Sequence, residues 1–171
     1  MEPVDHHTVK SAGEISVGLE AHDHHACKRD ALSVAEALCH GRGVRLTQVR
    51  KRVLELIWES HAPLGAYEIL ERLAREQRSA KPPTVYRALA FLVEQGLVHR
   101  IDSRNAFVGC ALQGEPHRAG FLICTRCGNV AEFEHQGVAK AITEVAQASD
   151  FRIERQTIEV AGTCQRCLED A

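Results

Sequence analysis

The sequence predicts an α+β fold in which a winged helix-turn-helix unit is followed by a small α/β unit. Amphipathic helical segments fill the chain up to about residue 95, and two short β-rich segments follow at 97–101 and 106–108. Helices followed by such a hairpin are typical of a winged helix. Beyond the hairpin lie two Cys-x-x-Cys pairs, each close to the end of a predicted strand, which indicates a four-cysteine zinc knuckle in the second unit.

Four helices are predicted before the hairpin, and capping residues mark their ends. They lie at 26–40, between Thr47 and Pro63, at 65–78 and at 83–95. Thr47 can cap the second helix, Pro63 ends it, and Gly96 lies just after the fourth. Residues 1–25 are polar and rich in His, so we expect a mobile arm there.

The second unit begins after a boundary that runs from Gly109 to about Gly114. Its predicted strands lie at 120–123, 129–133 and 151–160, and its helix lies at 138–148. We expect this helix to turn Val138, Ile142 and Val145 inward. A unit of about 60 residues has a marginal core, so a metal or a partner subunit is needed to stabilise it.

Composition excludes several classes of protein. The chain has 171 residues, of which 44% are hydrophobic, enough for one ordinary domain or two small ones with a real core. Its longest apolar runs are four or five residues, too short for a membrane-spanning segment. The first residues resemble no secretory signal, so we expect a cytoplasmic protein whose seven cysteines are reduced or metal-bound.

Charge is distributed unevenly along the chain. The whole chain carries −2, but residues 41–104 carry 12 Lys and Arg against seven Asp and Glu, a net charge of +5. This pattern indicates contact with a polyanion, although a solvated charged surface is an equally good interpretation of charge alone. Arg42 and Arg45, just after the first helix, are candidate phosphate contacts.

The helix at 83–95 has an apolar side and a polar side. Its predicted inward residues are Val85, Ala88, Leu89, Leu92 and Val93, and the opposite side carries Tyr86, Arg87, Ala90 and Glu94. Arg87 is a candidate base-reading residue, because a guanidinium can bind guanine through two hydrogen bonds. The hydroxyls of Thr84 and Tyr86 are candidate phosphate contacts. The alternative is a core helix whose Arg87 is only solvated.

Four of the seven cysteines form the two pairs, Cys124 with Cys127 and Cys164 with Cys167. Two such turns complete a tetrahedral set of four thiolates, which leaves no open position for catalysis, so the predicted site is structural. A redox dithiol is the alternative for one pair. Among the remaining cysteines, Cys39 is expected in the apolar core.

Two further groups of metal-ligating residues are visible. Cys110 lies at the boundary between the units, with His99 before it and His117 after it, and an acid such as Glu132 could complete a site. Spacing alone does not assemble this set. The N-terminal segment offers a possible extra metal site at His22, His24 and His25, with Cys27 nearby, and a solvated disordered arm is the alternative.

Several segments closely resemble the ferric uptake regulator family and, within it, the zinc uptake regulator branch. They are VRLTQVR at 44–50, AKPPTVYRAL at 80–89, FLVEQGLVH at 91–99 and FLICTRCG at 121–128. The resemblance extends from about residue 28 to residue 168. It implies a homodimeric, metal-activated repressor with a winged-helix DNA-binding domain, here at 26–108, and a dimerisation and metal-binding domain, here at 109–171. The His-rich arm at 1–25 is the part of the chain that departs most from the family.

Carried over residue by residue, the resemblance implies a structural zinc site at the four paired cysteines. It implies a regulatory site at His99, Cys110, His117 and Glu132, hence two zinc ions per chain. A thiolate ligand at this site suits zinc better than iron or manganese. The resemblance also places Tyr67 and Arg87 at base contacts. The family usually has Ser or Thr where this chain has Gly65, so the third helix is expected to have a weaker N-cap.

The resemblance therefore predicts a zinc-responsive transcriptional repressor, whose dimer binds a palindromic operator in double-stranded DNA when zinc is sufficient and controls zinc-uptake genes. The alternatives are a regulator of the same family that responds to iron, manganese or peroxide, and a zinc-buffering thiol protein. No activated nucleophile, phosphate-binding loop or open catalytic metal site is recognisable, so we predict neither an enzyme nor a small-molecule substrate.

Overall fold

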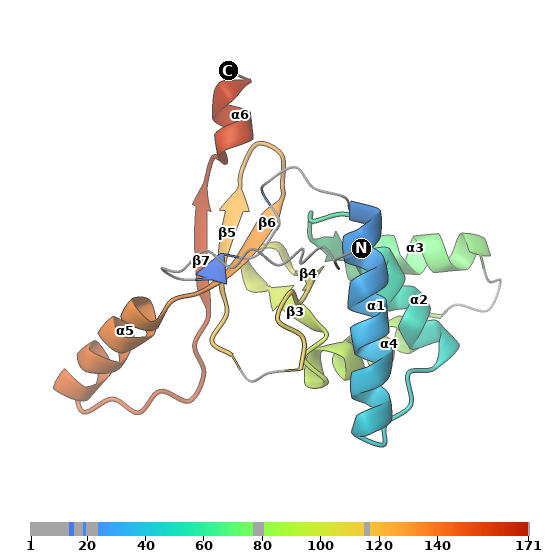
Figure 1. Cartoon of the computed structure of the whole chain (residues 1–171), viewed down its shortest axis with the longest axis horizontal. Helices are drawn as coiled ribbons and strands as arrows, with labels where there is room; N and C mark the ends of the chain where they lie inside the picture. Colours follow the sequence, from blue (N-terminus) through green and yellow to red (C-terminus); the bar gives the residue numbers. More distant parts are fainter. Residues whose placement is uncertain (1–13, 16–18, 20–23, 77–80, 115–116, 171) are drawn as a thin grey trace, which may run out of the picture.

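The structure is a computed structural model that describes residues 14–15, 19, 24–76, 81–114 and 117–170. Figure 1 shows helices α1 to α4 gathered at one end of the molecule, and the sheet that contains β5, β6 and β7 at the other. The hairpin formed by β3 and β4 lies between them. We call this hairpin, with its connecting turn, the wing.

The N-terminal half contains four helices and a three-stranded sheet. The helices are α1 (His24–Gly41), α2 (Gln48–Ile57), α3 (Ala66–Glu76) and α4 (Pro82–Glu94). The strands are β2 (Leu64–Gly65), β3 (Val98–Ile101) and β4 (Ala106–Gly109), antiparallel in the order β2-β4-β3. A short 3-10 turn, η1 (Asp102–Arg104), joins β3 to β4. The predicted winged helix-turn-helix is confirmed, and each helix lies close to its predicted position.

Local hydrogen bonds fix the helix ends. Thr47 Oγ1 accepts a bond from the N–H of Arg50 at 3.4 Å, so Thr47 caps α2 as predicted. Gly65 has no capping side chain, but its own N–H donates to Glu68 Oε2 at 3.0 Å. This bond is one half of a capping box, and it compensates in part for the missing cap at the start of α3.

The C-terminal half is a four-stranded sheet with two helices. Its elements are β5 (Gly120–Cys124), β6 (Val130–Glu134), α5 (Gln136–Ala148), β7 (Ile158–Gly162) and α6 (Gln165–Glu169). The strand order is β1-β6-β5-β7, in which β5 pairs antiparallel with β6 and parallel with β7. The edge strand β1 (Glu14–Ile15) comes from the segment predicted as an arm. The arm prediction otherwise falls mainly on residues outside the described part of the chain.

The wing contributes side chains to both apolar cores. The larger core joins the four helices and includes Val98 of β3. The smaller core joins Ile101 and Val108 of the wing to Phe121, Ile123 and Val130 of the C-terminal sheet. Ile101 and Val98 are only three residues apart, so one short strand connects the packing of the two halves.

The predicted strand at 151–160 is wrong over its first seven residues, because β7 begins only at Ile158. Residues 151–157 pair with no strand of the described chain. They instead run from the end of α5 past the wing, where Arg155 forms an ion pair with Asp102. An alternating pattern predicts a strand only where a neighbouring strand is available to pair with it.

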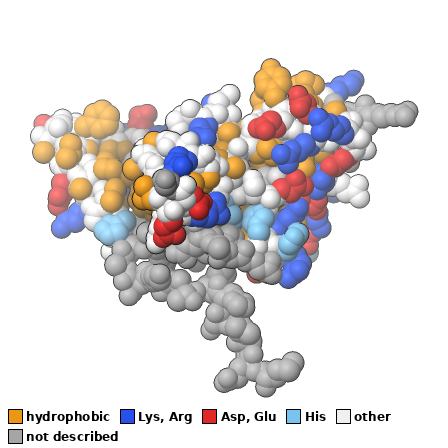
Figure 2. All heavy atoms as spheres, turned by 90° about the horizontal axis from the view of Figure 1, so that it is seen from above, with side chains coloured by type: hydrophobic (Ala, Val, Ile, Leu, Met, Phe, Trp, Pro, Cys, Tyr) orange, Lys and Arg blue, Asp and Glu red, His pale blue; other side chains and the backbone are white. Residues whose placement is uncertain are grey.

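The predicted inward side of α5 is also wrong for Val145, which is 68% exposed. Figure 1 shows α5 projecting away from the sheet, and Figure 2 shows hydrophobic side chains gathered at the end of the molecule where α5 lies. Phe151, just after α5, is 67% exposed. The described chain thus covers the apolar side of α5 only in part.

On α4, the predicted inward position of Val93 is wrong in part, because this residue lies at the margin of the apolar side and is 41% exposed.

Gly109, the last residue of β4, is expected to tolerate no side chain. A Cβ there would overlap the ring of the buried Trp58, with Cε2 as its nearest atom. Gly109→Ala should therefore lower the free energy of unfolding by about 1–3 kcal/mol, measured by urea denaturation, because the core must rearrange around the methyl group. Gly41→Ala is the control, since a Cβ there meets nothing within 4 Å. Equal effects of the two substitutions would contradict this packing.

Candidate metal centres and DNA-binding surface

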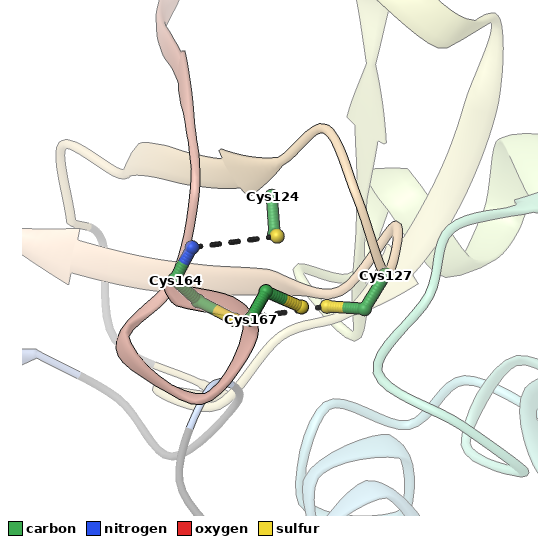
Figure 3. A group of neighbouring side chains, drawn as sticks. All are labelled: Cys124, Cys127, Cys164 and Cys167. Carbon is green, nitrogen blue, oxygen red and sulfur yellow. Dashed lines mark hydrogen bonds between the residues drawn. The ribbon is translucent and has the colours of Figure 1, made fainter. Parts of the chain in front are cut away.

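The two Cys-x-x-Cys turns lie side by side at one end of the C-terminal sheet (Figure 3). Cys124 ends β5, Cys127 follows it, and Cys164 and Cys167 lie at the start of α6. The four Sγ atoms all lie within 4.8 Å of one another, and those of Cys127 and Cys164 are 3.8 Å apart. Four thiolates around zinc, each at about 2.3 Å, would be about 3.8 Å apart. This four-cysteine cluster therefore has the dimensions of a tetrahedral zinc site.

Backbone hydrogen bonds join the two turns and favour the thiolate form of one cysteine. The N–H of Thr125 donates to the carbonyl of Gly162 at 2.8 Å, which ties the first turn to the end of β7. Backbone N–H groups of Cys127 and Cys164 donate to Cys124 Sγ and lower the pKa of that thiol to about 5. Cys124 is therefore a thiolate at neutral pH, which is the form that binds metal.

A second ligand set, which we call the hinge site, lies where the wing meets the C-terminal sheet. Its members are His99 on β3, Cys110 after β4, His117 before β5 and Glu132 on β6. Glu132 Oε1 is 3.0 Å from His99 Nε2 and 2.5 Å from His117 Nε2. The two Nε2 atoms are 3.2 Å apart, and Cys110 Sγ is 3.7 Å from His117 Nε2. The structure thus brings together four side chains that spacing alone could not assemble.

The hinge site concentrates buried ionisable groups. Within the described ranges, Glu132 is the one buried charged residue, at 4% exposure. Burial alone would raise its pKa, but hydrogen bonds with His117 and His99 outweigh burial and lower the pKa to about 2. Burial and the negative charge of Glu132 raise the pKa of Cys110. Cys110 is therefore a thiol at neutral pH in the absence of metal, and metal binding there must release its proton.

Contacts around the hinge site also connect the wing to the sheet. The ring of His99 packs edge-on against Phe121 of β5, with the ring centres 5.2 Å apart. At the end of the wing, the N–H groups of Asp102 and Ser103 donate to the carboxylate of Glu159 on β7, at 2.6 and 3.1 Å. A metal bound at the hinge site would thus add to a set of existing contacts between the two halves.

The outer side of α4 carries the predicted DNA contacts. Thr84, Tyr86 and Arg87 are all exposed there, and Tyr86 has 53% of its surface accessible. Tyr67, in the first turn of α3, is 75% exposed. All four side chains are thus accessible, as a recognition helix that enters a major groove requires.

The two arginines after α1 differ in their surroundings. Arg42 donates from Nη1 to the carbonyl of Gln95 at 2.7 Å and from Nη2 to the carbonyl of Gly114 at 3.2 Å. Its guanidinium therefore joins the ends of α1 and α4 to the chain that leads into the hinge site. Both Arg42 and Arg45 are exposed. Phosphate contact stays a prediction for both residues.

Residues 41–161 match the ferric uptake regulator family. The chain belongs to this family. It is 41% identical over 142 residues to the zinc uptake regulation protein of Escherichia coli (strain K12), over 82% of this chain and 83% of the relative. It is also similar to the solved structure of a zinc uptake regulator complexed with zinc and DNA, with a TM-score of 0.78 and 40% identity over 84% of this chain and 96% of that one. The chain is similar as well to the crystal structure of holo XcZur, with a TM-score of 0.74 and 41% identity over 82% of this chain and 98% of that one.

A third group of metal-ligating side chains is present in this family member. His24 of α1 lies close to Cys27 and to His61, which follows α2. His25 is exposed, and the predicted His22 lies outside the described residues. Sequence reasoning missed His61, which belongs to no motif.

No helix in the described part of the chain has the length and apolar character that a membrane crossing requires.

Cys127→Ala tests the structural role of the four-cysteine cluster. The variant keeps three thiolates around an ion whose binding energy, of order 10 kcal/mol, supports the folding of a small domain. We expect it to lose the zinc of this cluster and to unfold in its C-terminal half, measured by bound zinc and by circular dichroism. Cys39→Ala is the control, because that buried cysteine lies outside every ligand group. A fully folded Cys127→Ala with the parent's zinc content would contradict the assignment.

Proposed function

We propose that this chain is a zinc-responsive transcriptional repressor. Its homodimer binds palindromic operator DNA when zinc is sufficient, and it releases the operator, so that zinc-uptake genes are expressed, when zinc falls. It acts in the cytoplasm, uses two zinc ions per chain for this function, one structural at the four-cysteine cluster and one regulatory at the hinge site, and catalyses no reaction. Residues 26–108 bind DNA, and residues 109–171 provide dimerisation and metal ligands.

The hinge site carries this proposal, because its ligands come from both halves of the chain. His99 lies on the wing, whereas Glu132 lies on the C-terminal sheet. Zinc supplies a divalent charge that both residues can share. Bringing His99 and Glu132 together fixes the wing, and with it α4, relative to the C-terminal half. Metal binding can favour this arrangement only by the difference in affinity between it and other arrangements.

The donor set supports zinc over the other metals that regulators of this kind could sense. Cys110 offers a soft thiolate, and its side chain is fully buried among the other three ligands. Thiolate and imidazole together suit zinc, whereas iron and manganese sites outside iron–sulfur clusters mostly use nitrogen and oxygen donors. The similarity to zinc uptake regulators supports the same conclusion.

The exposed apolar surface at α5 supports a homodimer. Val145 and Phe151, each about two-thirds exposed, lie in the half assigned to dimerisation. In the dimer that we propose, a second copy of the chain covers them and the two α4 helices lie on one side. Those helices need a separation of about 34–36 Å to enter successive major grooves of a palindromic operator.

Cys110→Ser tests the sensing role of the hinge site. The variant loses a soft ligand but keeps both apolar cores, so it should remain folded and dimeric with the zinc of its four-cysteine cluster. It should lose operator binding at free zinc concentrations that activate the parent, measured by titrating zinc into protein with labelled operator. Cys39→Ser provides the control, since it places the same hydroxyl at another buried position.

A Cys110→Ser variant that responds to zinc like the parent would contradict the sensing role. Parent protein that binds the operator with iron or manganese but not with zinc would indicate a regulator for a different metal. Parent protein that binds zinc but does not bind the operator at any zinc concentration would indicate a zinc-buffering protein instead.

Arg87→Ala tests base reading by α4. Loss of a bidentate contact should weaken specific operator binding by about 1–3 kcal/mol, and should weaken binding to random DNA less. Lys140→Ala on α5 is the control, because it removes one exposed positive charge at the other end of the molecule (Figure 1). Equal losses of specific and random binding on Arg87→Ala would assign Arg87 to phosphate contact.

A further inference from the structure

A third cluster of metal-ligating side chains lies apart from the four-cysteine cluster and the hinge site. It consists of His24, Cys27 and His61, whose potential ligand atoms all lie within 4.8 Å of one another. The rings of His24 and His61 meet edge-on, with their centres 4.7 Å apart. All three residues are half-buried, and both ring nitrogens of His24 are shielded from solvent.

The sequence places two of these residues on one face of a helix. His24 and Cys27 are three positions apart in the first turns of α1, and residues at that spacing lie above one another on a helix. Cys27 also packs against the larger apolar core, which limits its movement. The helix thus presents one imidazole and one sulfur in the same direction.

The third residue is held in place by its loop. The carbonyl of His61 accepts a hydrogen bond from the N–H of Val130, the first residue of β6, at 3.0 Å. On its other side, the His61 ring lies edge-on to the buried Trp58, with ring centres 6.3 Å apart. The loop after α2 is therefore fixed to the C-terminal sheet, and it carries the His61 imidazole to the start of α1.

Two imidazoles and one thiolate are a donor set for zinc. Hard cations such as magnesium or calcium prefer oxygen ligands, and this group offers none. Tetrahedral zinc bound by three protein ligands keeps its fourth position open to water or to another donor. Such a site holds its metal less firmly than the four-thiolate cluster and exchanges it more readily.

We propose that His24, Cys27 and His61 form a third zinc site with one exchangeable coordination position. Zinc there joins the first turn of α1 to the loop after α2 and, through the His61–Val130 hydrogen bond, to the C-terminal sheet. The site fills at higher free zinc than the four-cysteine cluster. It does not depend on the proposed DNA-binding activity.

The test uses the full chain, dialysed against buffers of increasing free zinc. The parent should bind one zinc per chain more than His61→Ala or Cys27→Ser at the highest zinc level. His25→Ala is the matched control, because His25 neighbours His24 on α1 but is exposed and lies outside the group. It should bind as much zinc as the parent.

A second measurement follows the thiol itself. Zinc should slow alkylation of Cys27 in the parent and in His25→Ala, mapped by mass spectrometry of Cys27-containing peptides, and should leave the alkylation rate unchanged in His61→Ala. This readout remains valid if a substitution weakens another zinc site, because it reports on one cysteine. Equal zinc content in the parent and His61→Ala, or alkylation of parental Cys27 that is insensitive to zinc, would overturn the proposal.

Discussion

The carboxylate of Glu132 is the constraint on which the hinge site depends. A buried charge is costly unless charged or hydrogen-bonding partners surround it. Its partners here are His99 from the wing and His117 from the chain before β5, at 3.0 and 2.5 Å. The share of this compensation that His99 provides therefore depends on contact between the N-terminal and C-terminal halves. A divalent cation at the same point satisfies the carboxylate more fully than two imidazoles can.

The wing transmits this constraint to the DNA-binding helix. Val98 packs with the helices and Ile101 packs with the C-terminal sheet, so β3 cannot move relative to one half without disturbing the other. Under the proposed function, operator binding and zinc binding favour the same arrangement. Thermodynamic linkage then requires reciprocity, and operator DNA raises the affinity for zinc by the same factor as zinc raises the affinity for the operator.

Local signals in the sequence predicted most of the fold. Apolar periodicity, the Thr47 cap and the Cys-x-x-Cys spacing act over a few residues, and the corresponding helices, hairpin and four-cysteine cluster are present. The hinge site required the family resemblance, because its ligands come from four segments between His99 and Glu132. The prediction for Val145 failed because periodicity identifies an apolar side without showing which chain covers it.

Features that depend on tertiary contacts alone were not predictable. The pairing of β1 with β6 involves two residues that are more than 100 positions distant from their partners, and no local pattern marks them. His61 belongs to no motif, and it lies beside His24 in a loop whose backbone bonds to Val130, a residue far away in the sequence. The segment at 151–157 alternates like a strand, but it pairs with no strand of the described chain, and its Arg155 forms an ion pair with Asp102 in the turn of the wing.

The backbone at Cys110 has a consequence for how this fold can change over evolution. The N–H of Cys110 donates to the carbonyl of Leu97 at 3.1 Å, a bond in which the Cys110 side chain takes no part. The path of the chain at this position is therefore independent of the ligand it carries. A single codon change at Cys110 can replace sulfur by nitrogen or oxygen while the scaffold persists, and the ligand chemistry then favours another metal. Metal preference can diverge faster than architecture in a lineage built this way.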